Sequence, residues 1–217
     1  MQRSSGSAAR LSCSTGATTA TTNAHVDERA RELPPETIDW VEKLHAVVDE
    51  AAAPVAHANA ERLRCRAGCA DCCVDGLTVF EIEAAVIRRH HADLLEHGEP
   101  HPEGACAFLD AEGRCRIYGQ RPYVCRTQGL PIRWLEEDEI DEEIIESRDI
   151  CPKNIAGGPP LEELEADACW TIGPFEQRLA DRQHEADGGQ GLRVALRSLF
   201  SHEPRGGERR RLPLVTG

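Results

Sequence analysis

The sequence has few aromatic residues and no long apolar run. Phenylalanine, tryptophan and tyrosine make up 4% of its 217 residues, although hydrophobic residues reach 40%. Much of that apolar content is alanine, so we expect a modest core. No stretch approaches the ~20 apolar residues that span a bilayer, and residues 1–25 lack the apolar segment of a secretory signal. We therefore expect a cytoplasmic protein with no membrane partner.

Positive charge is also scarce. The chain has 25 Lys and Arg residues against 38 Asp and Glu residues, which gives a net charge of −13. An acidic surface repels phosphate backbones, so the composition argues against a nucleic-acid partner. The sequence also lacks a glycine-rich phosphate loop and a dinucleotide fingerprint. The partner that we expect is an unidentified small molecule or a protein.

The patterns predict a single small α+β domain, mainly helical with short β-hairpins and organised around a cysteine-rich metal centre. Residues 1–30 are expected to be disordered, 31–200 to form the domain, and 201–217 to be a flexible tail. The expected helices cover 36–63, kinked or interrupted at Pro54, and 79–96, with further helices from 161 and up to 185. Hairpins are expected over 106–118 and 130–150, and an amphipathic segment over 192–200.

Apolar residues at three- and four-residue steps predict which helix faces are buried. Thr78 and Glu81 form a capping-box pattern before the second helix, and the second hairpin is expected to have an acidic tip. The predicted buried residues are Ile38, Val41, Leu44, Val47 and Val48 in the first helix, and Ile82, Val86 and Leu94 or Leu95 in the second.

Eight of the ten cysteines fall in one middle stretch of the chain. They are Cys65, Cys69, Cys72, Cys73, Cys106, Cys115, Cys125 and Cys151. The first four lie so close in sequence that they cannot all pair with one another as disulfides without severe strain, and cytoplasmic thiols stay reduced. Thiolates are soft ligands that suit tetrahedral Zn²⁺ or an iron–sulfur cluster. Clustered spacing of this kind therefore predicts a thiolate metal site.

The spacing leaves the number of metal sites open. Eight thiols are enough for two four-thiolate sites, or for one cluster with spare thiols nearby. Because successive side chains diverge, Cys72 and Cys73 serve different metals, or one of them bridges or is not a ligand. Cys13 and Cys169 lie outside the cluster and are expected not to be ligands.

The arrangement resembles the YkgJ family, also called the CxxCxxCC or zinc- or iron-chelating family. The resemblance rests on RCRAGCADCCVDG, on CAFLDAEGRCRIYGQRPYVCR and on the segment from Cys151 to Asn154, and it covers about residues 62–155. It implies that the eight clustered cysteines are metal ligands. Members of the family have been taken to be iron–sulfur oxidoreductases, but the resemblance leaves the reaction open. Because there are more thiols than one zinc site needs, an iron–sulfur cluster is favoured over zinc.

Other functions remain open at this stage. The protein could be a non-enzymatic zinc-stabilised structural or interaction module, or a protein of metal storage or delivery. The spacing of Cys65, Cys69 and Cys72 also matches radical S-adenosylmethionine enzymes. Those enzymes usually carry an aromatic residue where this chain has Asp71, and they need an α/β barrel that the remaining residues do not outline.

The sequence assigns no catalytic residue, and it leaves open whether the protein is an enzyme. Arg121 and Arg126, which match the family pattern, are the candidates for binding the cofactor. Together with Arg133 they flank the second run of cysteines, where they would offset the negative charge of a multi-thiolate site or bind an anionic substrate. Tyr118 and Tyr123 more commonly pack with a bonded hydroxyl than transfer protons.

Overall fold

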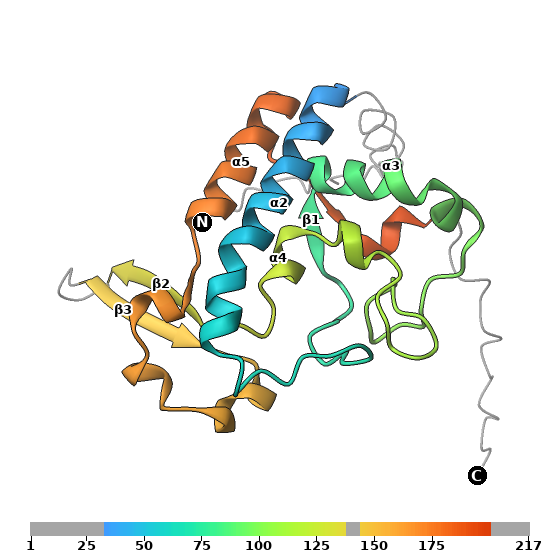
Figure 1. Ribbon diagram of the computed structural model, residues 1–217. Helices are drawn as coiled ribbons and strands as arrows, with labels where there is room; N and C mark the ends of the chain where they lie inside the picture. Colours follow the sequence, from blue (N-terminus) through green and yellow to red (C-terminus); the bar gives the residue numbers. More distant parts are fainter. Residues whose placement is uncertain (1–32, 138–143, 201–217) are drawn as a thin grey trace, which may run out of the picture.

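The computed structural model describes residues 33–137 and 144–200 (Figure 1). Helix α2 (Pro35–Ala58) contacts α3 (Glu81–His97), α4 (Tyr123–Arg126) and α5 (Pro174–Asp187). Two small sheets complete the fold, so the predicted α+β class is confirmed. The segments predicted to be disordered or flexible, 1–30 and 201–217, lie outside the described residues. No helix within the described ranges is long and apolar enough to cross a membrane.

Helix α2 forms because its apolar residues recur on one face. Val41, Leu44 and Val48 are buried, as predicted, whereas Val47 is 44% exposed and lies off that face. The helix ends at Ala58 rather than at residue 63, and Pro54 lies inside it. Of the predicted kink or interruption at Pro54, the interruption does not occur. Proline removes one helical hydrogen bond, but burial of apolar side chains before and after Pro54 keeps the last turn against the core.

Helix α3 begins two residues later than predicted, because Thr78–Phe80 forms strand β1. This strand pairs antiparallel with β5 (Arg193–Ala195). Phe80 is the N-cap and no side chain caps the helix, so the predicted capping box does not form. The predicted burial of Ile82, Val86 and Leu95 is confirmed.

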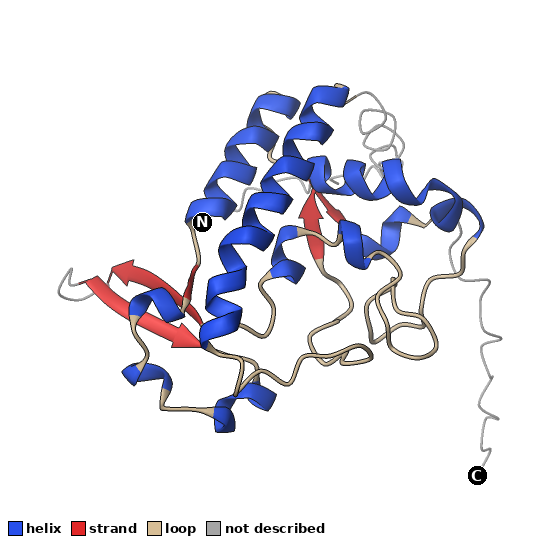
Figure 2. Ribbon diagram, viewed as in Figure 1, coloured by secondary structure: helices blue, strands red, loops and turns tan. Residues whose placement is uncertain are grey.

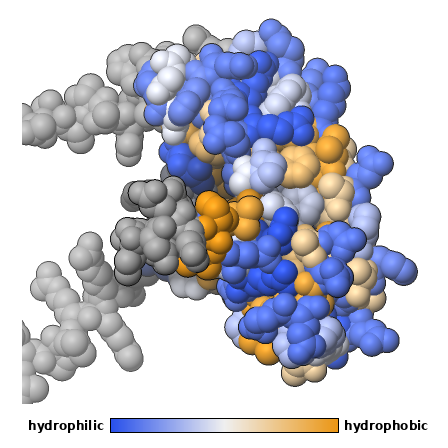
Figure 3. Space-filling model, turned by 90° about the vertical axis from the view of Figure 1, so that its left-hand side faces the viewer, coloured by the Kyte–Doolittle hydropathy of each residue, from blue (hydrophilic) through white to orange (hydrophobic). Residues whose placement is uncertain are grey.

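The second sheet contains the predicted hairpin. Strands β2 (Ile132–Glu137) and β3 (Ile144–Asp149) pair antiparallel, and β4 (Trp170–Thr171) adds to β2 in parallel. The predicted acidic tip falls largely on residues 138–143, outside the described residues. On the hairpin, the exposed apolar residues are Leu135, Ile144 and Ile145. Figure 3 views the molecule from that side and shows apolar surface set among hydrophilic residues.

Three other segments depart from the prediction. Residues 106–118 form one isolated bridge, between Leu109 and Cys115, instead of a hairpin. The helix expected from residue 161 is replaced by the short 3₁₀ turns η3 (Leu161–Glu163) and η4 (Ala166–Ala168). The last segment is β5 followed by the 3₁₀ turn η5 (Leu196–Leu199). In all three, contacts with the rest of the fold outweigh a weak local pattern.

Two clusters of buried side chains form the core. The first cluster lies among α2, α3, α4 and α5 and contains Val41, Leu44, Val48, Ile82 and Trp170, among others. The second lies between α3, β5 and the segment around Phe108, and it contains Ile87, Phe108, Ile117 and Phe200. Figure 2 shows long loops, drawn in tan, in the lower part of the view, below the long helices. Most of the clustered cysteines lie on these loops.

Candidate metal centre

Four segments of the chain carry the eight clustered cysteines. The loop between α2 and β1 carries four of them, the loop after α3 carries Cys106 and Cys115, helix α4 carries Cys125, and Cys151 precedes the 3₁₀ helix η2 (Pro152–Gly157). All eight are free thiols. The fold therefore supplies donors from four places that are far apart in sequence.

A first group of four thiols surrounds the start of the loop between α2 and β1. Burial is the main cause that raises the pKa of the Cys65 thiol, and a hydrogen bond from Asn154 opposes it. The thiols whose charge raises this pKa further are those of Cys69, Cys151 and Cys72. We call Cys65, Cys69, Cys72 and Cys151 the first group.

A second group of thiols lies closer to the second core cluster. Burial is the main cause that raises the pKa of the Cys125 thiol to about 12, and the charges of Cys106, Cys115, Glu83 and, least, Cys72 add to it. The backbone N–H of Cys106 donates to the carbonyl of Cys73 over 2.9 Å. The side chains of Cys106 and Cys115 pack against the second core cluster. We call Cys73, Cys106, Cys115 and Cys125 the second group.

The two groups meet at adjacent residues. The Cys73 thiol shares a hydrogen bond with Cys72, which lowers the pKa of Cys72 to about 6 and raises that of Cys73. The two side chains therefore do not diverge fully, and both have Cys125 as a charged neighbour. Cys72 shares a cavity with Cys151, whereas Cys73 has Cys106 and Cys125 among its charged neighbours.

Asn154 and Gly129 contact the first group through Cys65. The buried Asn154 side chain accepts from the Arg64 N–H over 2.9 Å and donates to the Gly129 carbonyl over 2.8 Å. It also donates weakly to Cys65 Sγ, at 3.8 Å. Gly129 has φ +90°, and a Cβ at this position would lie 2.4 Å from Cys65 Sγ. The sequence placed Asn154 within the family pattern but assigned neither residue a role.

Arg197 anchors the loop of the second group. Its guanidinium donates to both oxygens of Asp75, at 2.9 and 2.8 Å, and to the carbonyls of His101 and Ala105. Arg197 therefore joins the loop that follows Cys73 to the segment that precedes Cys106. The hydrogen bond from Arg197 is the main cause that lowers the pKa of Asp75 to about 2. Nothing in the cysteine motif pointed to this residue.

Arg121 and Arg126 lie beside the first group and not only beside the second. They line a cavity of about 290 Å³ together with Cys65. Both guanidiniums pair with Asp49, and the Arg126 side chain is 4% exposed. Arg121 also lies over the Tyr118 ring, 4.2 Å from its centroid. Their predicted cofactor-binding role stays a prediction.

Two other candidates have structural partners. Arg133 pairs with Glu146 across the β2–β3 hairpin, and it also donates to the Thr171 hydroxyl. The Tyr123 hydroxyl accepts from the indole N–H of Trp170 over 3.0 Å. Cys169, predicted not to be a ligand, is buried next to β4. Cys13 lies outside the described residues.

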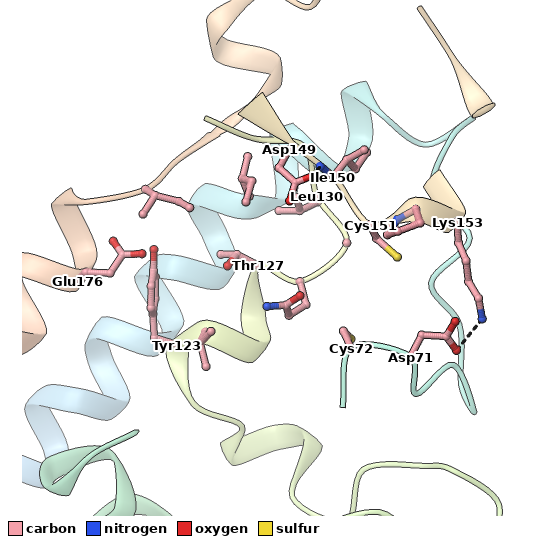
Figure 4. Close-up of a pocket in the computed structure, with 16 residues that line it drawn as sticks. Asp71, Cys72, Tyr123, Thr127, Leu130, Asp149, Ile150, Cys151, Lys153 and Glu176 are labelled. Atoms are coloured by element: carbon pink, nitrogen blue, oxygen red, sulfur yellow. Dashed lines mark hydrogen bonds and ion pairs between the residues drawn. The ribbon is translucent and has the colours of Figure 1, made fainter. Parts of the chain in front are cut away.

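A larger cavity of about 420 Å³ opens beside the first group (Figure 4). Cys72 and Cys151 lie at one end with the ion pair of Asp71 and Lys153, whose Oδ1 and Nζ atoms are 2.7 Å apart. Apolar side chains form much of the wall. The apolar lining residues include Leu130, Ile132, Ile150 and Ile172, and the far end holds Tyr123 and Glu176.

The donor set fits a thiolate-bound metal, because eight soft ligands fall into two neighbourhoods of four. Within the described residues, however, no group of three or more His, Cys, Asp or Glu side chains is arranged to hold a metal ion. Most of these thiols lie on loops.

Comparison with known proteins identifies the class of domain. Residues 64–152 match the family model CxxCxxCC, described as a "putative zinc- or iron-chelating domain". The matched segment contains all eight clustered cysteines, so the predicted resemblance is confirmed for this part of the chain. Residues 64–152, less than half of the chain, are thus similar to this domain. Neither the curated proteins nor the solved structures that were compared with the chain gave a match.

Proposed function

We propose that this protein binds iron or zinc through its eight clustered cysteines, arranged as two sites of four thiolates each. The observation that carries this proposal is the division of the thiols into two neighbourhoods. Four thiolates complete the shell of a structural zinc ion or hold one iron–sulfur cluster. The family match, which describes a zinc- or iron-chelating domain, supports the same conclusion.

We favour iron, held as an iron–sulfur cluster, and an oxidoreductase function. The support is the cavity beside Cys72 and Cys151, which is large enough for a small molecule. A cluster bound there would supply one-electron transfer, and the protein would hold the reacting molecule against apolar walls. Reduced thiols also fit the cytoplasmic location that the sequence predicts.

The second candidate is a zinc-stabilised module without enzymatic activity. It is supported by the second group, because Cys106 and Cys115 pack against a core cluster. Metal bound at such a place contributes directly to folding free energy. The module would then present its helices to a partner protein. The first experiment separates these functions.

That experiment is anaerobic purification followed by metal and sulfide analysis and a visible absorption spectrum. Iron with acid-labile sulfide and broad brown absorption would support the cluster. Stoichiometric zinc without colour would support the structural module. A protein with neither metal, even after anaerobic iron–sulfur reconstitution or incubation with zinc, would contradict the proposal.

Cysteine variants separate ligands from bystanders. We expect Cys69→Ser and Cys115→Ser each to lower the metal content, because each removes a ligand from one group. Cys13→Ser and Cys169→Ser are the matched controls and should keep the wild-type content. Equal metal content in all four variants would overturn the ligand assignment.

A further inference from the structure

The two cysteine groups differ in their exposure to solvent. Cys65 and Cys72 of the first group are exposed as residues, although the Cys65 sulfur lies against Gly129, and Cys69 and Cys151 are partly buried. Each of the four thiols in the second group is partly buried, and two of them pack against the second core cluster. An external molecule therefore meets the first group more readily than the second.

The two groups also differ in whether their cysteines line a cavity. Cys72 and Cys151 line the 420 Å³ cavity, and Cys65 lines the 290 Å³ cavity. Gln128 and Leu130 line both cavities and so form a wall between them. Cysteines of the first group therefore line a cavity on each side of this wall. Among the described residues that line these two cavities, none comes from the second group.

Contacts that hold the fold together surround the loops that carry Cys73, Cys106 and Cys115. Arg197 ties the loop after Cys73 to the segment before Cys106, and Phe108 is buried between the cysteines of that segment. Closed thiolate sites are typical of structural metals, whereas reactive sites keep an open position.

We propose that the two groups have different tasks. The second group is a structural metal site, and the first group is the working site, which a small molecule reaches through the cavities. This inference rests on the proposed metal-binding function and adds which cysteines are structural and which are open to a ligand.

The two cavities also differ in charge. The larger one has three lining carboxylates, those of Asp71, Asp149 and Glu176, and one ammonium, that of Lys153. The smaller one has two guanidiniums, of Arg121 and Arg126, and one carboxylate, of Asp49. The larger cavity therefore favours a neutral or cationic molecule, and the smaller one is the better route for an anion.

Thiol alkylation of the metal-loaded protein as purified tests the division. Neutral iodoacetamide and anionic iodoacetate are applied in parallel under anaerobic conditions, and modified cysteines are located by peptide mass spectrometry. Metal content is measured in the same sample. We expect the first group to react at least tenfold faster than the second. We also expect the iodoacetate-to-iodoacetamide rate ratio to be higher at Cys65 than at Cys72 and Cys151.

The outcomes are distinct. Bound metal with equal alkylation rates in the two groups, or with faster alkylation of the second group, would overturn the division and leave the proposed function intact. Equal reagent ratios at Cys65, Cys72 and Cys151 would overturn the charge assignment of the cavities. A chain that holds no metal under any loading condition would contradict the proposed function and the division together.

Two matched variants give an independent readout. Cys69→Ser should lose the metal of the first group and keep a melting temperature near that of the wild type. Cys115→Ser should lose the metal of the second group and melt at a clearly lower temperature, or fail to accumulate as folded protein. Equal losses of melting temperature would contradict the division.

Discussion

Replacing Gly129 by alanine tests whether the loop after α4 shapes the first cysteine group. Gly129 has φ +90°, a conformation that costs an L-residue about 1–2 kcal/mol. The new Cβ would also lie 2.4 Å from Cys65 Sγ. Because non-bonded heavy atoms separate to about 3.5–4.0 Å, the sulfur has to move by more than about 1 Å.

The loss of folding stability expected for Gly129→Ala follows from the backbone strain and from the clash with Cys65. Forcing extra volume into a packed site costs about 1–3 kcal/mol beyond the backbone strain. Ligand distances in a metal site are held within about 0.2 Å, so a shift of this size removes Cys65 from the metal. We therefore expect Gly129→Ala to lose the metal of the first group and to retain that of the second.

Gly189→Ala is the matched control. Gly189 has φ +89°, but a Cβ there meets no atom within 4 Å. Gly189→Ala should therefore be destabilised by the backbone strain alone, without a steric clash. At about 2–4 °C per kcal/mol for a chain of this size, the additional ~1–3 kcal/mol should lower the melting temperature of Gly129→Ala by roughly 2–12 °C relative to Gly189→Ala. The assay is metal analysis combined with thermal unfolding. Full metal content and equal melting temperatures in the two variants would refute the reasoning.

Three further changes probe the contacts around the centre. The buried Glu83 carboxylate accepts from the Tyr123 N–H at 2.8 Å and pairs with His45 at 3.2 Å. Glu83→Ala should therefore lower the urea-unfolding free energy by about 1–3 kcal/mol, and more than Glu83→Gln does. Burial, followed by a hydrogen bond with Glu176, raises the pKa of Tyr123. A tyrosine whose folded-state pKa is raised stabilises the fold fully below its unfolded-state pKa of about 10, and this contribution is lost as pH rises toward the folded-state pKa. Urea-unfolding midpoints above about pH 10 should therefore fall more in the wild type than in Tyr123→Phe, and parallel pH dependences in the two proteins would contradict this. Asn154→Ala leaves buried backbone groups without their partner, which should cost about 1–3 kcal/mol and weaken metal retention by the first group, as measured by unfolding and metal analysis; retention equal to that of the wild type would exclude the supporting role.

Local patterns predicted the regular elements well. The apolar spacing of Val41, Leu44 and Val48 indicated α2, and α3 followed from the same kind of periodicity. The β2–β3 hairpin was predicted from two strand-forming runs separated by an acidic segment. These predictions succeeded because helices and hairpins are formed by contacts between residues close in sequence.

The prediction failed where distant contacts determine the conformation. Residues 106–118 have strand-forming character, yet they form a single bridge because Phe108 and Ile117 are drawn into the second core cluster. Thr78 could not cap α3 because its strand pairs with β5, whose residues lie more than a hundred positions further along the chain. Neither contact has a local signal.

The sequence by itself determined the cysteine pattern that predicts a thiolate metal domain. Four cysteines that lie so close in sequence are typical of a metal site, because thiolates are soft ligands. Only the tertiary structure decided which thiols are neighbours. It brought Cys151 to the first group and Cys125 to the second, and it placed Asn154 behind Cys65, 89 residues away. Arg197 reaches Asp75 across 122 residues. Such contacts depend on how helices and core clusters pack, and a local spacing contains no information about that packing.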